Sequence, residues 1–286
     1  MRGVGRAVGG LLVLGLAVGA AGLGVAALLE RADLTVPTRE RCAAELDGTR
    51  WSLAPDQAGT AALLAATTLH RGMPARATTI TLATALQESS LRNLDYGDRD
   101  SVGIFQQRPS QGWGTVEQIM DPVYSTNAFL DALEEVEGYQ DLELTVAAQT
   151  VQRSAFPDAY AQHETRSRAW ASGLTGWSPA TVTCDLRDAD APGDPAALAA
   201  RVARDFAGTV VASSEGTTVA LDATALPGAE PDRAGWAVAH WAVAVAAPHQ
   251  VVAVEHADRR WDRAASTWGA AAEVVPPGQV RVTLAG

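Results

Sequence analysis

The feature that most constrains this chain is an uncharged stretch near its N-terminus, residues 7–29, preceded by Arg2 and Arg6. About 23 uncharged residues are enough to cross a bilayer as a helix, which needs roughly 20. The positive flank predicts that the N-terminus stays inside the cell and that the rest is exported. A cleaved signal peptide is the alternative, with residues 18–20 as a small-residue cleavage site. Either way, residues 35–286 are expected outside the cytoplasm, attached to the cell membrane or secreted.

The cysteine content fits an exported protein. The chain has only two cysteines, Cys42 and Cys184, and in an oxidising compartment such a pair predicts a disulfide. Two unpaired buried thiols are the alternative. A disulfide between them would join the start of a domain to its end, which gives three parts: an anchor at 1–34, a first domain at 35–186 and a second domain at 187–286.

The charge of the chain argues against a nucleic-acid partner, and its motifs give no sign of a bound metal or cofactor. The formal net charge is −11, with 33 acidic and 22 basic residues. Phosphate recognition needs a basic surface, so we expect no nucleic-acid partner. The five histidines form no His-Glu-x-x-His motif and the cysteines no Cys-x-x-Cys motif, so no metal site and no cofactor are expected. Protein partners and oligomeric state are left open.

Apolar periodicity predicts an α+β chain whose two domains differ in character. The first domain is mainly α-helical, and one long polar loop at 94–114 interrupts its helices. The second is a small α+β domain beyond a linker rich in Asp, Pro and Gly. The expected helices of the first domain are 57–69, 74–93, 122–133, 142–154 and 158–174. For the second we expect helices at 196–206 and 236–246 and strands at 209–212, 217–221, 250–255 and 279–284.

The polar loop follows a glutamate that is placed as a general acid would be. Glu88 lies near the C-terminal end of an otherwise apolar helix. Apolar surroundings and the negative end of the helix dipole both favour the protonated carboxyl, which a general acid needs. A glutamate exposed at a polar helix end is the alternative on local sequence alone. A long loop inside a compact domain is usually functional or disordered.

Two motifs around this loop resemble those of a known family. The segment 85–90 reads Ala-Leu-Gln-Glu-Ser-Ser, and residues 103–107 read Gly-Ile-Phe-Gln-Gln. Together they resemble the lysozyme-like fold of soluble lytic transglycosylases and goose-type lysozymes. The stretch 93–114 is similar to that of an actinobacterial, membrane-anchored group with such a domain. The resemblance covers roughly residues 42–186.

The resemblance implies roles for individual residues. Glu88 would be the catalytic acid and Ser89 the polar residue beside it. Gly103 would allow a close approach of the backbone, and Gln106 would hydrogen-bond to sugar. The family's third motif is Ala-Tyr-Asn-x-Gly on a later helix.

No Tyr-Asn pair stands at the expected place of this third motif, residues 147–153. There Gln149 or Gln152 would replace it in binding substrate. The departure concerns the substrate subsites and does not affect the acid.

A second carboxylate would decide the mechanism. A hydrolase that inverts configuration needs a base across the sugar from the acid, and Asp95, Asp98 and Asp100 all lie in the loop. Turn formation beside Gly97 is an alternative role for them, because Asp accepts hydrogen bonds from backbone N–H groups. Calcium binding is a further alternative, although the EF-hand spacing is absent. A lytic transglycosylase needs only the one glutamate, since the sugar's own 6-hydroxyl attacks.

Other loop residues are candidates for contacts with glycan. Tyr96 and Trp113 have rings able to stack on sugars, whereas Phe105 is expected in the core. Gln107 is a candidate polar contact.

The second domain is similar to a C-terminal domain of other actinobacterial cell-wall proteins. Their final strand carries His-Val-His, but here residues 279–282 have no histidine. This domain is therefore expected to hold no metal and to act as a binding or spacing module.

These observations support two hypotheses. The first is a membrane-anchored enzyme that cleaves the MurNAc–GlcNAc β-1,4 bond of peptidoglycan, either a lytic transglycosylase or a muramidase, with Glu88 as acid and base. The second is a catalytically weak cell-wall-binding or scaffolding protein that has the same cleft.

Overall fold

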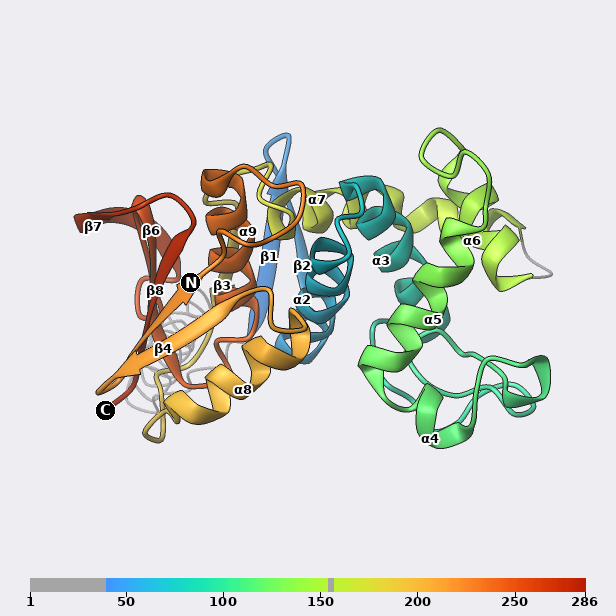
Figure 1. Cartoon of the computed structure of the whole chain (residues 1–286), viewed down its shortest axis with the longest axis horizontal. Helices are drawn as coiled ribbons and strands as arrows, with labels where there is room; N and C mark the ends of the chain where they lie inside the picture. The colour runs from blue at the N-terminus through green and yellow to red at the C-terminus, as the bar shows by residue number, and fades with distance from the viewer. Residues whose placement is uncertain (1–39, 154–156) are drawn as a thin grey trace, which may run out of the picture. The chain divides into compact units, whose positions relative to one another are not determined.

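The computed structural model describes residues 40–153 and 157–286, which contain eight α-helices and two antiparallel sheets in an α+β arrangement (Figure 1). The predicted α+β class is therefore correct. The predicted anchor or signal segment, 7–29, lies outside the described residues. Within the described residues, no helix combines the length and the apolar character needed to cross a membrane.

A small sheet that the sequence analysis did not predict joins the two ends of the first region. Its strands are β1 (Arg41–Leu46), β2 (Thr49–Leu53) and β3 (Val182–Asp185), in the order β2-β1-β3. The hairpin between β1 and β2 turns at Asp47 and Gly48, both with positive φ. Asp-Gly is the residue pair that such a two-residue turn favours.

The predicted disulfide is present in this sheet. Cys42 of β1 and Cys184 of β3 lie directly opposite each other in the antiparallel register, and their sulfur atoms are bonded. Both residues are buried, at 1% and 0% exposure. The bond closes a loop whose ends are 142 residues apart in sequence.

Helices make up the rest of the first region. Helices α2 and α3 match the predicted helices, although α3 ends at Ser89 instead of near residue 93. The stretch 158–163, predicted as the start of an α-helix, is 3-10 helix instead. The helical elements are α2 (Pro55–His70), α3 (Ala75–Ser89), η1 (Pro109–Gln111), α4 (Val116–Ile119), α5 (Pro122–Glu134), α6 (Leu144–Gln152), η2 (Pro157–His163) and α7 (Glu164–Leu174).

The second region contains two helices and a five-stranded sheet of order β4-β5-β8-β6-β7. Strand β7 was not predicted, because its run of Gly and Ala shows no alternation of polar and apolar residues. Only the first half of β6 was predicted. The elements are α8 (Pro195–Asp205), β4 (Val211–Glu215), β5 (Thr218–Asp222), α9 (Pro231–Ala244), β6 (Val251–Asp262), β7 (Thr267–Val275) and β8 (Gln279–Leu284).

The two regions share one hydrophobic core, and α9 is at its centre. This helix packs against α2, α7 and β3 of the first region and against β6 and β8 of its own. From Ala234 to Ala244 every residue of α9 is buried. Figure 1 shows α9 between the five-stranded sheet and α2, with α5 and α6 beyond α2 and α3.

Candidate functional site

Helix α3 carries Glu88 at the point where the chain reverses direction. The helix is buried along most of its length, and Glu88 itself is partly buried. Ser90 ends the helix in the left-handed conformation, and the N–H of Leu91 reaches back to the carbonyl of Ala85. The N–H of Ser90 bonds to the carbonyl of Leu86 at 3.1 Å, which is the single bond of an αL C-cap. It directs the chain out of the core and into the polar loop directly after the glutamate.

The carboxylate of Glu88 has one buried partner that the sequence analysis missed. The phenol of Tyr160, in η2, donates a hydrogen bond of 2.7 Å to Glu88 Oε1. Tyr160 is completely buried. Because Oε1 is engaged from the interior, Oε2 is the oxygen left to exchange a proton with a ligand.

A signal for Tyr160 was present in the sequence. Ala159-Tyr160 repeats the first two residues of the Ala-Tyr-Asn-x-Gly motif, downstream of the 147–153 segment where the motif was sought.

A second contact joins η2 to the end of α3. Gln87 Oε1 accepts from Gln162 Nε2 at 3.2 Å and faces His163 Nε2 at 3.1 Å. Burial, followed by the charge of Arg166, lowers the pKa of His163. The neutral imidazole then donates from Nε2 to the amide oxygen. These bonds hold η2 against α3 next to the Glu88–Tyr160 pair.

Ser89 ties the helix end to the second motif. Its hydroxyl donates to the backbone carbonyl of Ile104 at 2.7 Å and accepts from the N–H of Arg92 at 3.2 Å. Ser89 is buried. In this structure it positions the loop beside Glu88.

The Gly-Ile-Phe-Gln-Gln segment forms a tight turn. Gly103 has φ +82°, and a Cβ there would lie 2.9 Å from the carbonyl oxygen of Ile119. Only glycine meets both conditions without strain. Phe105 is fully buried and stacks on Phe129 with ring centroids 4.6 Å apart, as expected for a core residue.

The glutamines predicted as binding residues occupy different environments. Gln106 is partly buried and its amide donates to the carbonyls of Gly103 and Tyr96 at 3.2 and 3.3 Å. Gln107 is 2% exposed and donates to the carbonyl of Ser125. It therefore supports the loop from inside. Gln152 donates to the carbonyl of Phe105 at 2.8 Å, and Gln149 is partly buried on α6.

The three loop aspartates also occupy different environments. Asp100 accepts from Arg108 Nε at 2.9 Å, from the N–H of Ser110 at 2.8 Å and from its hydroxyl at 3.0 Å. The backbone N–H of Ser110 and the side chain of Arg108 lower the pKa of Asp100 well below its ordinary value. Asp95 and Asp98 are exposed, and Asp98 lies 3.9 Å from Arg99.

The aromatic candidates lie on the same loop. Tyr96 is 69% exposed, so most of its side chain is accessible to a ligand. Trp113 is partly buried and packs against the hydrophobic core.

In the described part of the chain, no group of three or more His, Cys, Asp or Glu residues is arranged to hold a metal ion. In the second region, Arg281 takes the place where histidines were sought, and it pairs with Glu255 at 3.3 Å.

Comparison with known proteins assigns no family to this chain. No family model matches its sequence, and no curated protein matches it either.

Proposed function

We propose that the protein cleaves the MurNAc–GlcNAc β-1,4 bond of peptidoglycan and that Glu88 is its general acid and base. The observation that carries the proposal is the pair formed by a partly buried glutamate at the end of α3 and the buried Tyr160 phenol on its Oε1. The polar loop with Gln106 and the exposed Tyr96 adjoins this helix end. Such a loop offers amide groups and a ring face to a sugar chain.

The chemistry needs one carboxyl group with two protonation states. Protonated at Oε2, Glu88 gives its proton to the glycosidic oxygen, and the bond to C1 of MurNAc breaks. The carboxylate then takes the proton of the 6-hydroxyl of the same sugar, whose oxygen attacks C1 and closes a 1,6-anhydro ring. The hydrogen bond from Tyr160 fixes the orientation of the carboxyl in both steps.

Hydrogen bonds remove one of the three loop aspartates, Asp100, from the candidates for the base of a hydrolase. A hydrolase that inverts configuration needs a second carboxylate free to activate water. Asp100 is already engaged by Arg108 and Ser110. Asp95 and Asp98 are the remaining candidate bases for the hydrolytic alternative.

We further propose that residues 7–29 anchor the protein in the cell membrane or direct its secretion, so that residues 35–286 meet the cell wall. The disulfide Cys42–Cys184 supports an oxidising compartment. Peptidoglycan is the proposed partner, and no cofactor enters the mechanism.

The test incubates full-length wild type and the Glu88→Gln variant with isolated peptidoglycan and analyses the soluble products by mass spectrometry. Anhydro-muropeptides from wild type alone are expected. Reducing ends would indicate a muramidase and direct attention to Asp95 and Asp98. If neither protein releases product and both bind the wall equally, the wall-binding alternative replaces the enzyme.

A further inference from the structure

A pocket of about 490 Å³ lies next to the candidate site, where the first and second regions meet. Asn93 and Ile104 contribute from the loop, and Ile104 is the residue whose carbonyl accepts the Ser89 hydroxyl. Helix α2 supplies one wall and α8 another. Its apolar lining comes from Pro55, Leu63, Ile104, Pro122, Ala247 and Pro248. A volume of this size suits a small ligand.

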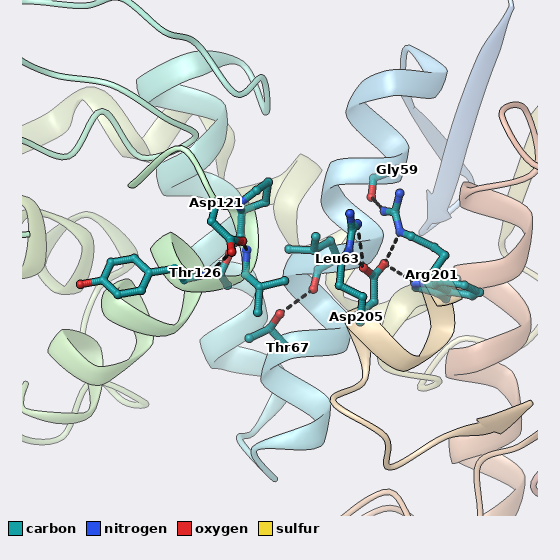
Figure 2. A network of polar contacts seen from close by, with 12 residues as sticks. Gly59, Leu63, Thr67, Asp121, Thr126, Arg201 and Asp205 are labelled. Atoms are coloured by element: carbon teal, nitrogen blue, oxygen red, sulfur yellow. Dashed lines mark hydrogen bonds and ion pairs between the residues drawn. The ribbon is translucent and has the colours of Figure 1, made fainter. Parts of the chain in front are cut away.

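Two arginines of α8 enter this pocket and share a single carboxylate. Asp205, whose side chain is 0% exposed, accepts from Arg201 Nε at 2.7 Å and from Arg204 Nη2 at 2.9 Å. Arg201 also donates to the carbonyl of Gly59 at 2.9 Å. In Figure 2, Arg201 and Asp205 lie beside α2, on one side of Leu63. Asp121, at the start of α5, lies on the other side of Leu63. Asp205 holds both guanidinium groups in place from the protein side.

Arg201, Arg204 and Asp205 together carry one net positive charge. Asp205 is the only carboxylate paired with Arg201 or Arg204 in residues 40–153 and 157–286. Asp56 is the acidic side chain in the lining, and it already pairs with Arg92 at 3.0 Å.

The charges of Arg201, Arg204 and Asp205 also act on the neighbouring His249. Burial lowers its pKa, Arg201 and Arg204 lower it further, and Asp205 and Asp194 oppose them. A guanidinium edge facing an apolar pocket is a site for a carboxylate or phosphate.

Gly59 is a lining position at which a larger side chain can be added to fill the pocket. It lies within α2, where glycine is less favourable than alanine. A Cβ on Gly59 would meet no atom within 4 Å, so packing does not require the glycine. Its missing side chain leaves space in the pocket.

We infer that this pocket binds a carboxylate carried on a small aliphatic residue, as in the stem peptides of peptidoglycan. The two arginines bind the carboxylate, and Leu63, Ile104 and the prolines contact methyl groups. A dianionic phosphate would find one uncompensated charge and no further cation among the lining residues. Assigning the carboxylate to stem peptides rests on the proposed function, whereas the preference for a carboxylate does not.

The experiment measures binding to the full-length protein by titration calorimetry, with N-acetyl-D-alanyl-D-alanine as probe, a monoanion with two methyl side chains. The matched neutral control is the C-terminal amide of the same dipeptide. We expect the dipeptide to bind roughly ten- to a hundredfold more tightly, the usual effect of a hydrogen-bonded charge. Equal binding of the two probes would overturn the proposal, and so would tighter binding of inorganic phosphate.

Two variants locate the binding. Arg204→Gln leaves Asp205 paired with Arg201 and is expected to weaken dipeptide binding by a similar factor. Gly59→Leu fills the pocket while favouring the helix, so it should abolish binding with no loss of thermal stability; Gly59→Ala is its control and should bind. Unchanged binding in Gly59→Leu would show that the dipeptide binds elsewhere and would overturn the assignment.

The outcome separates this proposal from the proposed function. Dipeptide binding by a protein that does not cleave peptidoglycan would leave the pocket assigned and remove the enzyme. Cleavage of peptidoglycan without dipeptide binding would leave the enzyme assigned and remove the pocket assignment.

Discussion

The phenol of Tyr160 donates to Oε1 of Glu88 at 2.7 Å, although the two residues lie 72 positions apart in the chain. The contact brings a fully buried hydroxyl from a 3-10 helix to the end of α3. Within residues 40–153 and 157–286, Oε1 accepts this hydrogen bond and Oε2 accepts none. We regard this pair as the centre of the candidate site.

Replacing Tyr160 with Phe tests the pair directly. A hydrogen bond to a charged group contributes about 1.5–3 kcal/mol, so the rate of peptidoglycan cleavage should fall roughly ten- to a hundredfold. The release of soluble muropeptides over time measures the rate. Tyr139→Phe is the matched control, because Tyr139 is also buried and is not among the residues of the candidate site. A Tyr160→Phe variant that folds and cleaves at the wild-type rate would remove Tyr160 from the mechanism.

Local sequence predicted the parts of this site that depend on local structure. An apolar helix with Glu88 at its end, a polar loop after it and the pairing of Cys42 with Cys184 all follow from periodicity or residue type. The Tyr160 contact does not, because nothing in the sequence around residue 160 indicates which helix end it meets. The Ala-Tyr dipeptide was the one available signal.

The errors in the fold have similar causes. Strands β1 and β3 are stabilised by each other, with Cys42 opposite Cys184, and neither shows clear alternation over its few residues. Strand β7 contains Gly269 and three alanines, which have low strand propensity. Its pairing with β6 decides its conformation.

Asp100 should stabilise the loop in a pH-dependent way. The N–H of Ser110 and the side chain of Arg108 lower its pKa from the ordinary value of 3.8. A carboxyl with a depressed folded-state pKa contributes stability above the unfolded-state pKa and loses it as the pH falls below. We therefore expect Asp100→Asn to lower the melting temperature at pH 7. The difference from wild type should shrink below pH 3.8.

The control for this experiment is Asp98→Asn. Asp98 is exposed and lies 3.9 Å from Arg99, so its replacement should change the melting temperature little at any pH. If Asp98→Asn and Asp100→Asn behave alike, the hydrogen bonds of Asp100 do not stabilise the loop.

His240 predicts a second pH effect, at the contact between α9 and α7. The ring is fully buried; Nδ1 lies 2.8 Å from the carbonyl of Gly173, and Nε2 has no hydrogen-bond partner in the described residues. Burial lowers its pKa from 6.5 to about 4, the bond to Gly173 opposes this, and His256 adds to it.

The sign of the effect follows from which state binds the proton. Below pH 6.5 the unfolded chain protonates His240 while the folded chain does not, so stability falls as the pH falls from 6.5 to 4. Between pH 7 and pH 5 this costs roughly 2 kcal/mol of unfolding free energy, which denaturant titration measures. His240→Gln should remove this part of the slope, and His70→Gln, whose imidazole is only partly buried, should remove less. An identical slope in wild type and His240→Gln would contradict the prediction.

The shared core predicts that the first region cannot fold without the second. Trp268 donates to the carbonyl of Val182 at 2.8 Å, and Trp261 donates to the hydroxyl of Thr183 at 3.1 Å. Deleting residues 187–286 would remove both bonds and expose the apolar surfaces of α2, α7 and β3 that α9 covers. The chain ending at residue 186 is therefore expected to aggregate or to lose its cooperative thermal transition, even with the disulfide intact.

The matched control is full-length protein with a protease site inserted in the exposed segment 187–192 and then cut. This control keeps both pieces and should stay folded, because the shared core holds them together. A soluble 1–186 fragment with a sharp transition would show that the first region is an independent domain.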